Sequence, residues 1–174
     1  MNTFEGKLVL DRTEGDEWGK LVVDDAIRTK CFELLGLDMI GFSLPDYEAH
    51  MSAFDEKETR QLPEDFWFEG KLCDFTPTHL RVVNPEGWDE VNACVILCVE
   101  CKPIEKLRKA LGFPAKMYGD HEFHVTIGIS ENKIDGCIEN VVRLFNEYLK
   151  DDYSRILEVE LQQAEGDEYG QEQY

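Results

Sequence analysis

The chain has 174 residues, of which 43% are hydrophobic and 32% are charged, a composition typical of a globular domain and not of a disordered chain. Its formal net charge of −19 argues against binding to long duplex nucleic acid, which depends on many lysine and arginine contacts to phosphates. That charge still allows a small phosphate ligand. The sequence has no apolar run of membrane-spanning length and no basic or apolar secretion signal at its start, so we expect a cytoplasmic protein that does not bind membranes.

Strands and helices are predicted to alternate in the first part of the chain. Asp24 or Asp25 can cap a helix that runs to about Leu35, where Gly36 stops it. Pro45 marks a turn before the next strand. We therefore expect, in chain order, a strand ending with residues 7–10, an acidic loop at 11–19, this helix, strands at 38–43 and 47–54, and an exposed connection or short helix at 55–65.

The second part of the chain is predicted to contain more strand. An apolar, β-branched run at 92–101 indicates a buried strand, and Pro103 suits the start of a helix that Gly112 closes. Apolar residues from Ile134 to Leu149 recur at spacings of three and four, which indicates an amphipathic helix. The remaining expectations are strands at 66–72 and 79–83 separated by a turn at 76–77, a turn at 84–88, a strand at 121–129 and a closing strand at 154–161.

Together these elements predict an α+β fold, in one domain or two intimate lobes. Beyond residue 162 the chain is acidic and has few apolar side chains. We therefore assign residues 1–162 to the folded domain and expect residues 163–174 to form a disordered tail.

Two of the predicted strands carry a histidine followed two places later by a hydroxyl residue. These pairs are His50 with Ser52 and His124 with Thr126. Residues i and i+2 of a strand share a face, so each strand can present an imidazole and a hydroxyl together. A single pair of this kind occurs often by chance, and a lone strand histidine is usually structural. Two copies in different halves of the chain favour one catalytic pair.

The chemistry available to such a pair is phosphodiester cleavage without a metal. That reaction needs a base for the nucleophile, an acid for the leaving oxygen and donors for the other phosphoryl oxygens. Imidazole suits both proton-transfer roles because its ordinary pKa lies near neutrality. Ser52 and Thr126 would then bind the phosphate between His50 and His124, and either histidine can be the base.

The same two stretches resemble a known superfamily. His50-Met-Ser52 and Phe123-His-Val-Thr-Ile-Gly128 are similar to the two signature strands of the 2H phosphoesterases, and residues 87–124 resemble the Swiss-army-knife, RNA-repair-like branch of that superfamily. The resemblance implies a bilobal domain in which two antiparallel sheets face each other across a central cleft, with helices packed outside. It also implies activity without metal or other cofactor on a cyclic nucleotide, a short oligonucleotide or a 2′,3′-cyclic phosphate RNA end. Ser52 departs from the usual threonine.

Other residues near the second motif are candidates for substrate contacts. Trp88 and Tyr118 could stack on a nucleobase and Lys116 could contact a phosphate, although such residues are commonly core or plain surface. His121 is expected at the rim of the site rather than as a metal ligand. A local basic cluster is either the solvated face of a helix or a rim that attracts an anionic substrate: Lys102, Lys106, Arg108, Lys109 and Lys116.

The six cysteines are expected to be free thiols, as is usual in a reducing compartment. Cys94, Cys98 and Cys101 have the C-x3-C-x2-C spacing of an iron–sulfur site. On a strand, however, Cys94 and Cys98 share one face and Cys101 takes the other. Small buried side chains are therefore the favoured interpretation, and we expect no metal.

Two further hypotheses belong to other functional classes. The chain could be a nucleotide-binding module that sequesters its ligand intact, in which case the ligand is recovered unchanged from a tight complex. It could instead be an acidic interaction protein that mimics nucleic acid, in which case His50 and His124 are incidental. Neither hypothesis explains the paired motifs as well as the phosphodiesterase does.

Overall fold

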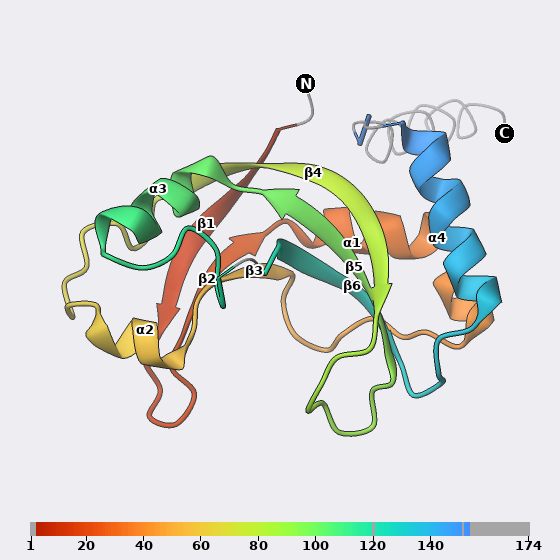
Figure 1. Cartoon of the computed structure of the whole chain (residues 1–174), viewed down its shortest axis with the longest axis horizontal. Helices are drawn as coiled ribbons and strands as arrows, with labels where there is room; N and C mark the ends of the chain where they lie inside the picture. The colour runs from red at the N-terminus through yellow and green to blue at the C-terminus, as the bar shows by residue number, and fades with distance from the viewer. Residues whose placement is uncertain (1–2, 120, 151, 154–174) are drawn as a thin grey trace, which may run out of the picture.

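A computed structural model describes residues 3–119, 121–150 and 152–153 of the chain (Figure 1). Within these residues the protein is α+β, as the sequence predicted, and no helix there combines the length and apolarity needed to cross a membrane. The strands are β1 (Phe4–Asp11), β2 (Trp18–Val23), β3 (His50–Phe54), β4 (Leu72–Val83), β5 (Ala93–Glu100) and β6 (Phe123–Ser130). The helices are α1 (Asp25–Leu34), the 3-10 helix η1 (Leu37–Ile40), α2 (Glu56–Gln61), α3 (Lys102–Ala110) and α4 (Gly136–Leu149).

The six described strands form one antiparallel sheet that closes on itself. Their order is β1-β2-β3-β6-β5-β4, and β1 also pairs with β4. Most neighbours pair over four or more residues, but β3 and β6 meet at a single pair, Met51 and Val125. The β3–β6 seam is thus the narrowest junction of the sheet, and both histidine motifs lie on it.

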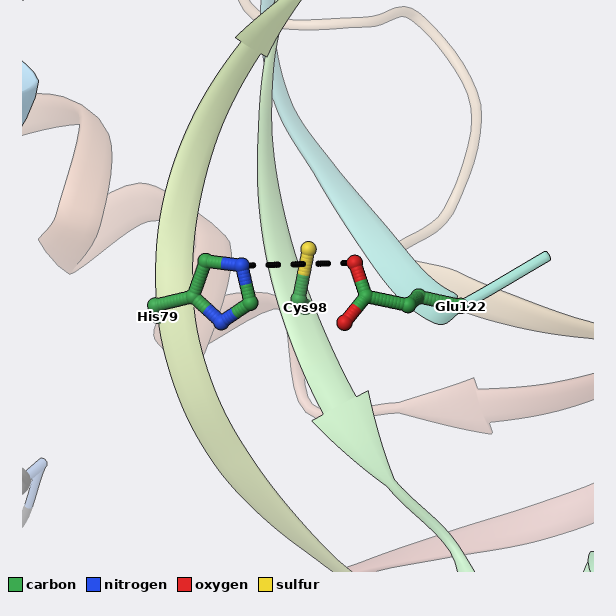
Figure 2. A group of neighbouring side chains, drawn as sticks. All are labelled: His79, Cys98 and Glu122. Carbon is green, nitrogen blue, oxygen red and sulfur yellow. Dashed lines mark ion pairs between the residues drawn. The ribbon is translucent and has the colours of Figure 1, made fainter. Parts of the chain in front are cut away.

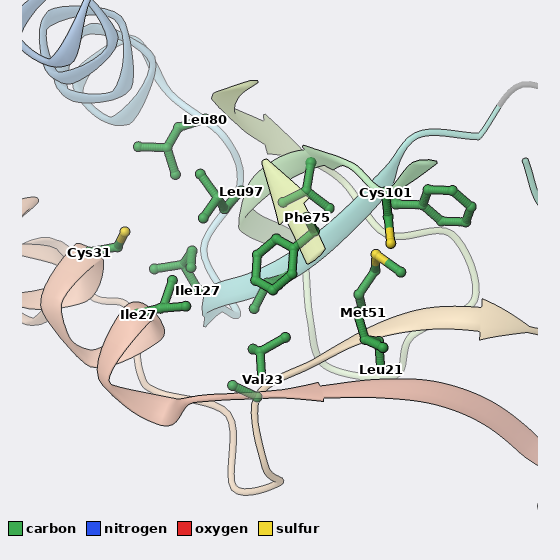
Figure 3. Packing of buried hydrophobic residues seen from close by; sticks show 14 of the residues in the cluster. Leu21, Val23, Ile27, Cys31, Met51, Phe75, Leu80, Leu97, Cys101 and Ile127 are labelled. Carbon is green, nitrogen blue, oxygen red and sulfur yellow. The ribbon is translucent and has the colours of Figure 1, made fainter. Parts of the chain in front are cut away.

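The hydrophobic core lies on one face of this sheet, between the strands and the helices packed against them, and Ile27 and Cys31 of α1 belong to it (Figure 3). Met51 and Val125 have no exposed surface, and Leu21 and Leu97 on neighbouring strands are equally buried. Because successive strand residues point to opposite faces, burying Met51 and Val125 turns the residues on either side of each toward the face of the sheet away from the core. The period-two pattern of the sequence therefore places the histidine motifs outside the core.

Helices cover the sheet where its strands would otherwise be unpaired. α4 lies along β4, and the Asn146 side chain bonds both backbone groups of Leu80, accepting from its N–H at 2.8 Å and donating to its carbonyl at 3.0 Å. The Asn146 amide thus replaces a missing neighbouring strand. α1 begins where the Asp24 carboxylate accepts the Ala26 N–H and ends at Gly36, which has a left-handed φ of 61°.

Several predicted elements match the structure. The first strand, the two histidine strands, the cysteine strand, the helices over α1, α3 and α4, and the short helix after residue 55 are all present within a few residues of their expected bounds. The predicted strand at 154–161 and the predicted tail at 163–174 lie outside the described residues.

Four predictions of secondary structure were wrong. Trp18–Val23 is strand β2, although the sequence indicated an acidic loop up to residue 19. Residues 38–43 are η1 followed by a turn, and only Ser43 forms an isolated β-bridge, to Ile129, because Gly36 and Gly41 adopt left-handed φ angles on either side of η1. Residues 66–72 form local turns, with Glu69 N–H bonded to Phe66 O at 3.1 Å. No turn separates 66–72 from 79–83, because β4 runs through Pro77.

Pro77 is tolerated within β4 for a geometric reason. Its partner on β5 is Val99, and the register shifts between Pro77 and His79. A bulge at this point leaves out a ladder hydrogen bond that proline cannot donate. The same bulge sets the face on which His79 lies.

The basic cluster predicted on α3 is split by the fold. Lys102, Lys106 and Lys109 are exposed, as expected of a solvated helix face, but Arg108 has no exposed surface. Its guanidinium forms two bonds of 2.8 Å to the Glu58 carboxylate on α2 and also donates to the carbonyls of Ala53 and Pro114. Arg108 therefore joins α3, α2 and β3 instead of serving as surface charge or substrate rim.

All six cysteines are free, and five of them are buried. Burial raises the pKa of Cys31, Cys98 and Cys101 to about 12 and the pKa of Cys73 and Cys94 to about 11. Cys137 alone among them is exposed.

We expect native, reduced protein at mildly alkaline pH to react rapidly with one equivalent of a thiol reagent, and unfolded protein with six. A second fast-reacting thiol in the native protein would contradict this burial. So would a fast-reacting thiol that persists in Cys137→Ser.

Candidate active site

The β3–β6 seam brings both predicted motifs onto one surface. Continuing the antiparallel pairing of Met51 with Val125 by one residue in each direction sets His50 opposite Thr126 and Ser52 opposite His124. All four side chains are half-buried. They form a square of two imidazoles and two hydroxyls on the face of the sheet away from the core, with each histidine diagonal to the other.

Both imidazoles are held in the same way. His50 Nδ1 lies 2.9 Å from the carbonyl oxygen of Glu48, and His124 Nδ1 lies 3.1 Å from the carbonyl oxygen of Glu122. A carbonyl can only accept, so each Nδ1 carries the hydrogen. In the neutral rings this leaves Nε2 with a free lone pair, available to take or return a proton.

Burial lowers the pKa of both His50 and His124. In each case the backbone carbonyl bonded to Nδ1 opposes this effect, and nearby positive charge adds to it. The positive charges acting on His124 include that of His50, which places the two rings within electrostatic range of each other. Both rings are therefore mainly neutral at neutral pH in the unliganded protein.

Ser52 has a partner that the sequence did not predict. The indole Nε1–H of Trp18, on β2, donates to Ser52 Oγ at 2.9 Å. Oγ thereby accepts one hydrogen bond and keeps its own hydrogen for another acceptor. Trp18 was missed because β2 was assigned to a loop, and only the pairing of β2 with β3 brings the indole to the site.

A second unpredicted group borders His50 and Thr126. The Tyr47 ring lies 5.4 Å from the His50 ring, and burial raises the pKa of its hydroxyl, an effect that the neighbouring Thr126 side chain opposes. The Arg28 guanidinium of α1 lies 5.9 Å from the centre of the Tyr47 ring. Arg28 is buried and bonds Asp25 at 3.0 Å, whereas its Nε and Nη1 have no hydrogen-bond partner. A positive charge is thus held beside His50.

A cavity of about 670 Å³ opens beside Ser52 and His124. Trp88 and Tyr118, two of the predicted substrate-binding residues, line it. Lys116, His50 and Thr126 are not among its lining residues. Those that the sequence did not single out for this role include Trp18, Arg81, Glu122, Met117 and Asn84. The cavity thus lies on the His124 side of the square and has largely aromatic and apolar walls.

The segment before β6 shapes one side of this cavity. Met117 is buried and bridges to His121, while Tyr118 is exposed and has a left-handed φ of 53°. A non-glycine residue rarely adopts this backbone conformation, and such strain is concentrated at functional sites. The His121 ring lies 6.0 Å from the Tyr118 ring and 5.4 Å from the His124 ring, so His121 also lies in the cavity wall.

One group of side chains in the described part of the chain has the composition of a metal site, and it does not include His121. His79, Cys98 and Glu122 offer ligand atoms that all lie within 4.8 Å of one another (Figure 2). His79 pairs with Cys98 across β4 and β5, and Cys98 pairs with His124 across β5 and β6. The iron–sulfur spacing does not lead to a cluster, because Cys101 lies in the core beneath β4 and donates to the Asp74 carbonyl.

Comparison with known proteins adds no identification. No family model matches the sequence, and no curated protein or solved structure matches the chain.

Proposed function

We propose that the protein is a metal-independent phosphodiesterase in which His50 and His124 exchange protons with one phosphodiester. The observation that supports this most directly is the matched setting of the two rings. Each lies at the β3–β6 seam, has Nδ1 bonded to a carbonyl two residues earlier, and has no hydrogen bond from Nε2 to any residue that the structure describes. Structural histidines commonly use both nitrogens in the fold, whereas a proton-transfer pair needs one nitrogen of each ring available to a ligand.

The proposed reaction uses all four members of the square. One histidine takes the proton of the attacking hydroxyl, which is water or a ribose 2′-hydroxyl, and the other gives a proton to the departing oxygen. The Ser52 hydroxyl donates to a non-bridging phosphoryl oxygen, a role for which the Trp18 N–H leaves its hydrogen free. Thr126 holds a second oxygen. Either histidine serves as the base.

The proposed fold of the site is the bilobal one implied by the resemblance. β1, β2 and β3 form one half and β4, β5 and β6 the other, with one histidine motif on the innermost strand of each. The narrow pairing of β3 with β6 supports this division, because two halves that pair over one residue pair can splay on the face that carries the histidine motifs.

The proposed substrate is a small cyclic nucleotide or oligonucleotide, or a 2′,3′-cyclic phosphate at an RNA end. The cavity beside His124 has room for a nucleoside and has Trp88 and Tyr118 on its walls. Exposed aromatic rings at such a position suit stacking on a base. The net charge of −19 supports a short ligand, because a long polyanion would be repelled.

We expect Trp88→Ala and Tyr118→Ala to raise KM by about 5- to 100-fold with a smaller effect on kcat, because stacking on a base is worth about 1–3 kcal/mol. Steady-state kinetics on the best substrate measures this effect. Trp67→Ala is the matched control, because Trp67 is 63% exposed and lies outside the cavity. An unchanged KM in both cavity variants would show that the nucleobase does not bind in this cavity.

A cleavage panel tests the proposed function. Wild-type protein in excess EDTA is incubated with 2′,3′-cyclic mononucleotides, RNA ends, and 3′,5′- or 2′,5′-linked cyclic di- and trinucleotides. We expect one class to be cleaved and the others to be poor substrates. Tight binding of a nucleotide that is recovered unaltered would replace this proposal with a sequestering module, and a complete lack of cleavage and binding would refute both.

A further inference from the structure

The face of the sheet away from the core carries a row of side chains that continues past the square. The register sets His79 of β4 opposite Cys98 of β5, and Cys98 opposite His124 of β6. Glu122 lies two residues before His124 and so faces the same side. A nitrogen, a sulfur and an oxygen ligand from three neighbouring segments therefore converge beside the proposed phosphate site (Figure 2).

The hydrogen bonds around His79 orient it as a ligand. The Thr78 hydroxyl donates its hydrogen to the Cys98 carbonyl at 3.1 Å and lies 3.0 Å from His79 Nδ1. Because that hydroxyl has one hydrogen, it must accept from His79, so Nδ1 carries the proton. The unprotonated Nε2 then lies 4.0 Å from Glu122 Oε2. Metal-binding histidines are commonly fixed in this way through their other nitrogen.

Glu122 and Cys98 complete the set. Arg81 Nη1 donates to Glu122 Oε2 at 2.9 Å, which orients the carboxylate and leaves Oε1 without a bond to Arg81. The Cys98 thiol is buried, forms no disulfide and lies within reach of both partners. Zn–ligand bonds of about 2.0–2.3 Å require these atoms to approach by about 1 Å, which side-chain rotation can supply.

This donor set favours one kind of ion. Imidazole, thiolate and carboxylate together suit Zn²⁺, whereas Mg²⁺ and Ca²⁺ prefer oxygen ligands alone. Three protein ligands leave a fourth position for water or a substrate oxygen. On binding, the Cys98 thiol loses its proton to solvent and the thiolate bonds the metal.

We propose that His79, Cys98 and Glu122 form a zinc site, and that zinc bound there inhibits the enzyme. The second half of this proposal rests on the proposed phosphodiesterase function. Glu122 lines the cavity and its carbonyl holds His124, so an ion on its carboxylate lies next to the substrate. The open coordination position of the zinc ion captures a phosphate oxygen and draws the phosphate away from the two imidazoles.

Zinc binding is measured on reduced, metal-free protein by competition with a chromophoric chelator. The wild type binds one zinc, and His79→Gln, Cys98→Ser and Glu122→Gln each weaken binding by at least about 10-fold. The control variants His121→Gln and Cys94→Ser should bind zinc as the wild type does, because they replace a nearby histidine and a nearby cysteine that are not proposed ligands. Cobalt(II) in wild-type protein gives a thiolate charge-transfer band that Cys98→Ser abolishes. No binding, no such band, or loss of binding in His121→Gln instead would overturn the site.

A second arm tests inhibition separately. Each protein's cleavage rate in zinc is divided by its own rate in EDTA. The wild type is inhibited at the zinc concentrations at which it binds one ion, EDTA restores its rate, and Cys98→Ser loses this sensitivity. Zinc that binds without slowing cleavage would overturn the inhibition and leave the site. Failure of the phosphodiesterase proposal would leave the binding and cobalt results intact, so the two proposals are judged independently.

Discussion

His50→Ala and His124→Ala are each expected to lower kcat/KM by about 10²- to 10⁴-fold while leaving the protein folded. The reason for the loss is that each ring supplies one of the two proton transfers, and a positioned acid or base is worth this much. Steady-state cleavage of the best substrate in excess EDTA measures it.

The fold should survive these substitutions because neither ring contributes to the core. Each is half-buried on the face away from the core, and its one hydrogen bond to a described residue is with a carbonyl of its own segment. Losing such a bond costs about 1 kcal/mol. Denaturant unfolding is the control. Wild-type cleavage by either variant would show that its histidine is not part of the reaction, whereas unfolding of both would point to a structural role.

Arg108→Met is expected to reduce the free energy of unfolding by about 3–5 kcal/mol. Removing the guanidinium leaves the Glu58 carboxylate largely buried without its partner, and breaking one side of a buried ion pair has a cost of this size. It also removes the donors to the carbonyls of Ala53 and Pro114. Urea unfolding measures the effect.

The matched control for this substitution is Arg143→Met. Arg143 makes an exposed pair with Glu147 one turn along α4 at 2.9 Å, and such pairs contribute at most about 1 kcal/mol. A loss in Arg108→Met no larger than in Arg143→Met would contradict the role assigned to the buried pair. Because Arg108 bonds the Ala53 carbonyl next to Ser52, a large loss should also reduce cleavage.

The histidine motifs could be predicted from the sequence because their signal is local. A period of two fixes which side chains share a face, and it holds whatever the strand pairs with. His50 with Ser52 and His124 with Thr126 therefore face outward together, as the alternation indicated. That the two strands meet at Met51 and Val125 is a long-range fact, for which the sequence offered only the similarity of the two motifs.

The supporting groups could not be predicted because each depends on a partner distant in the chain. Trp18 reaches Ser52 only because β2 pairs with β3, and Arg28 is buried beside Tyr47 only because α1 packs near the seam. His79 lacks a hydroxyl at i+2 and so belongs to no motif in the sequence, yet its cross-strand partner Cys98 completes a group of possible metal ligands with it. Arg108 was grouped with surface lysines because its acceptor could not be seen in the sequence. That acceptor, the Glu58 carboxylate, lies on a different helix, α2.

A double-mutant cycle tests most directly whether His50 and His124 act on one phosphate. The cleavage rates of wild type, His50→Ala, His124→Ala and the double variant are measured in excess EDTA on one substrate. Residues that act as a unit are strongly non-additive, so the double variant should be no more than about 10-fold slower than the slower single variant. Losses that multiply in full would show two independent contributions, and wild-type turnover in either single variant would contradict the two-histidine mechanism.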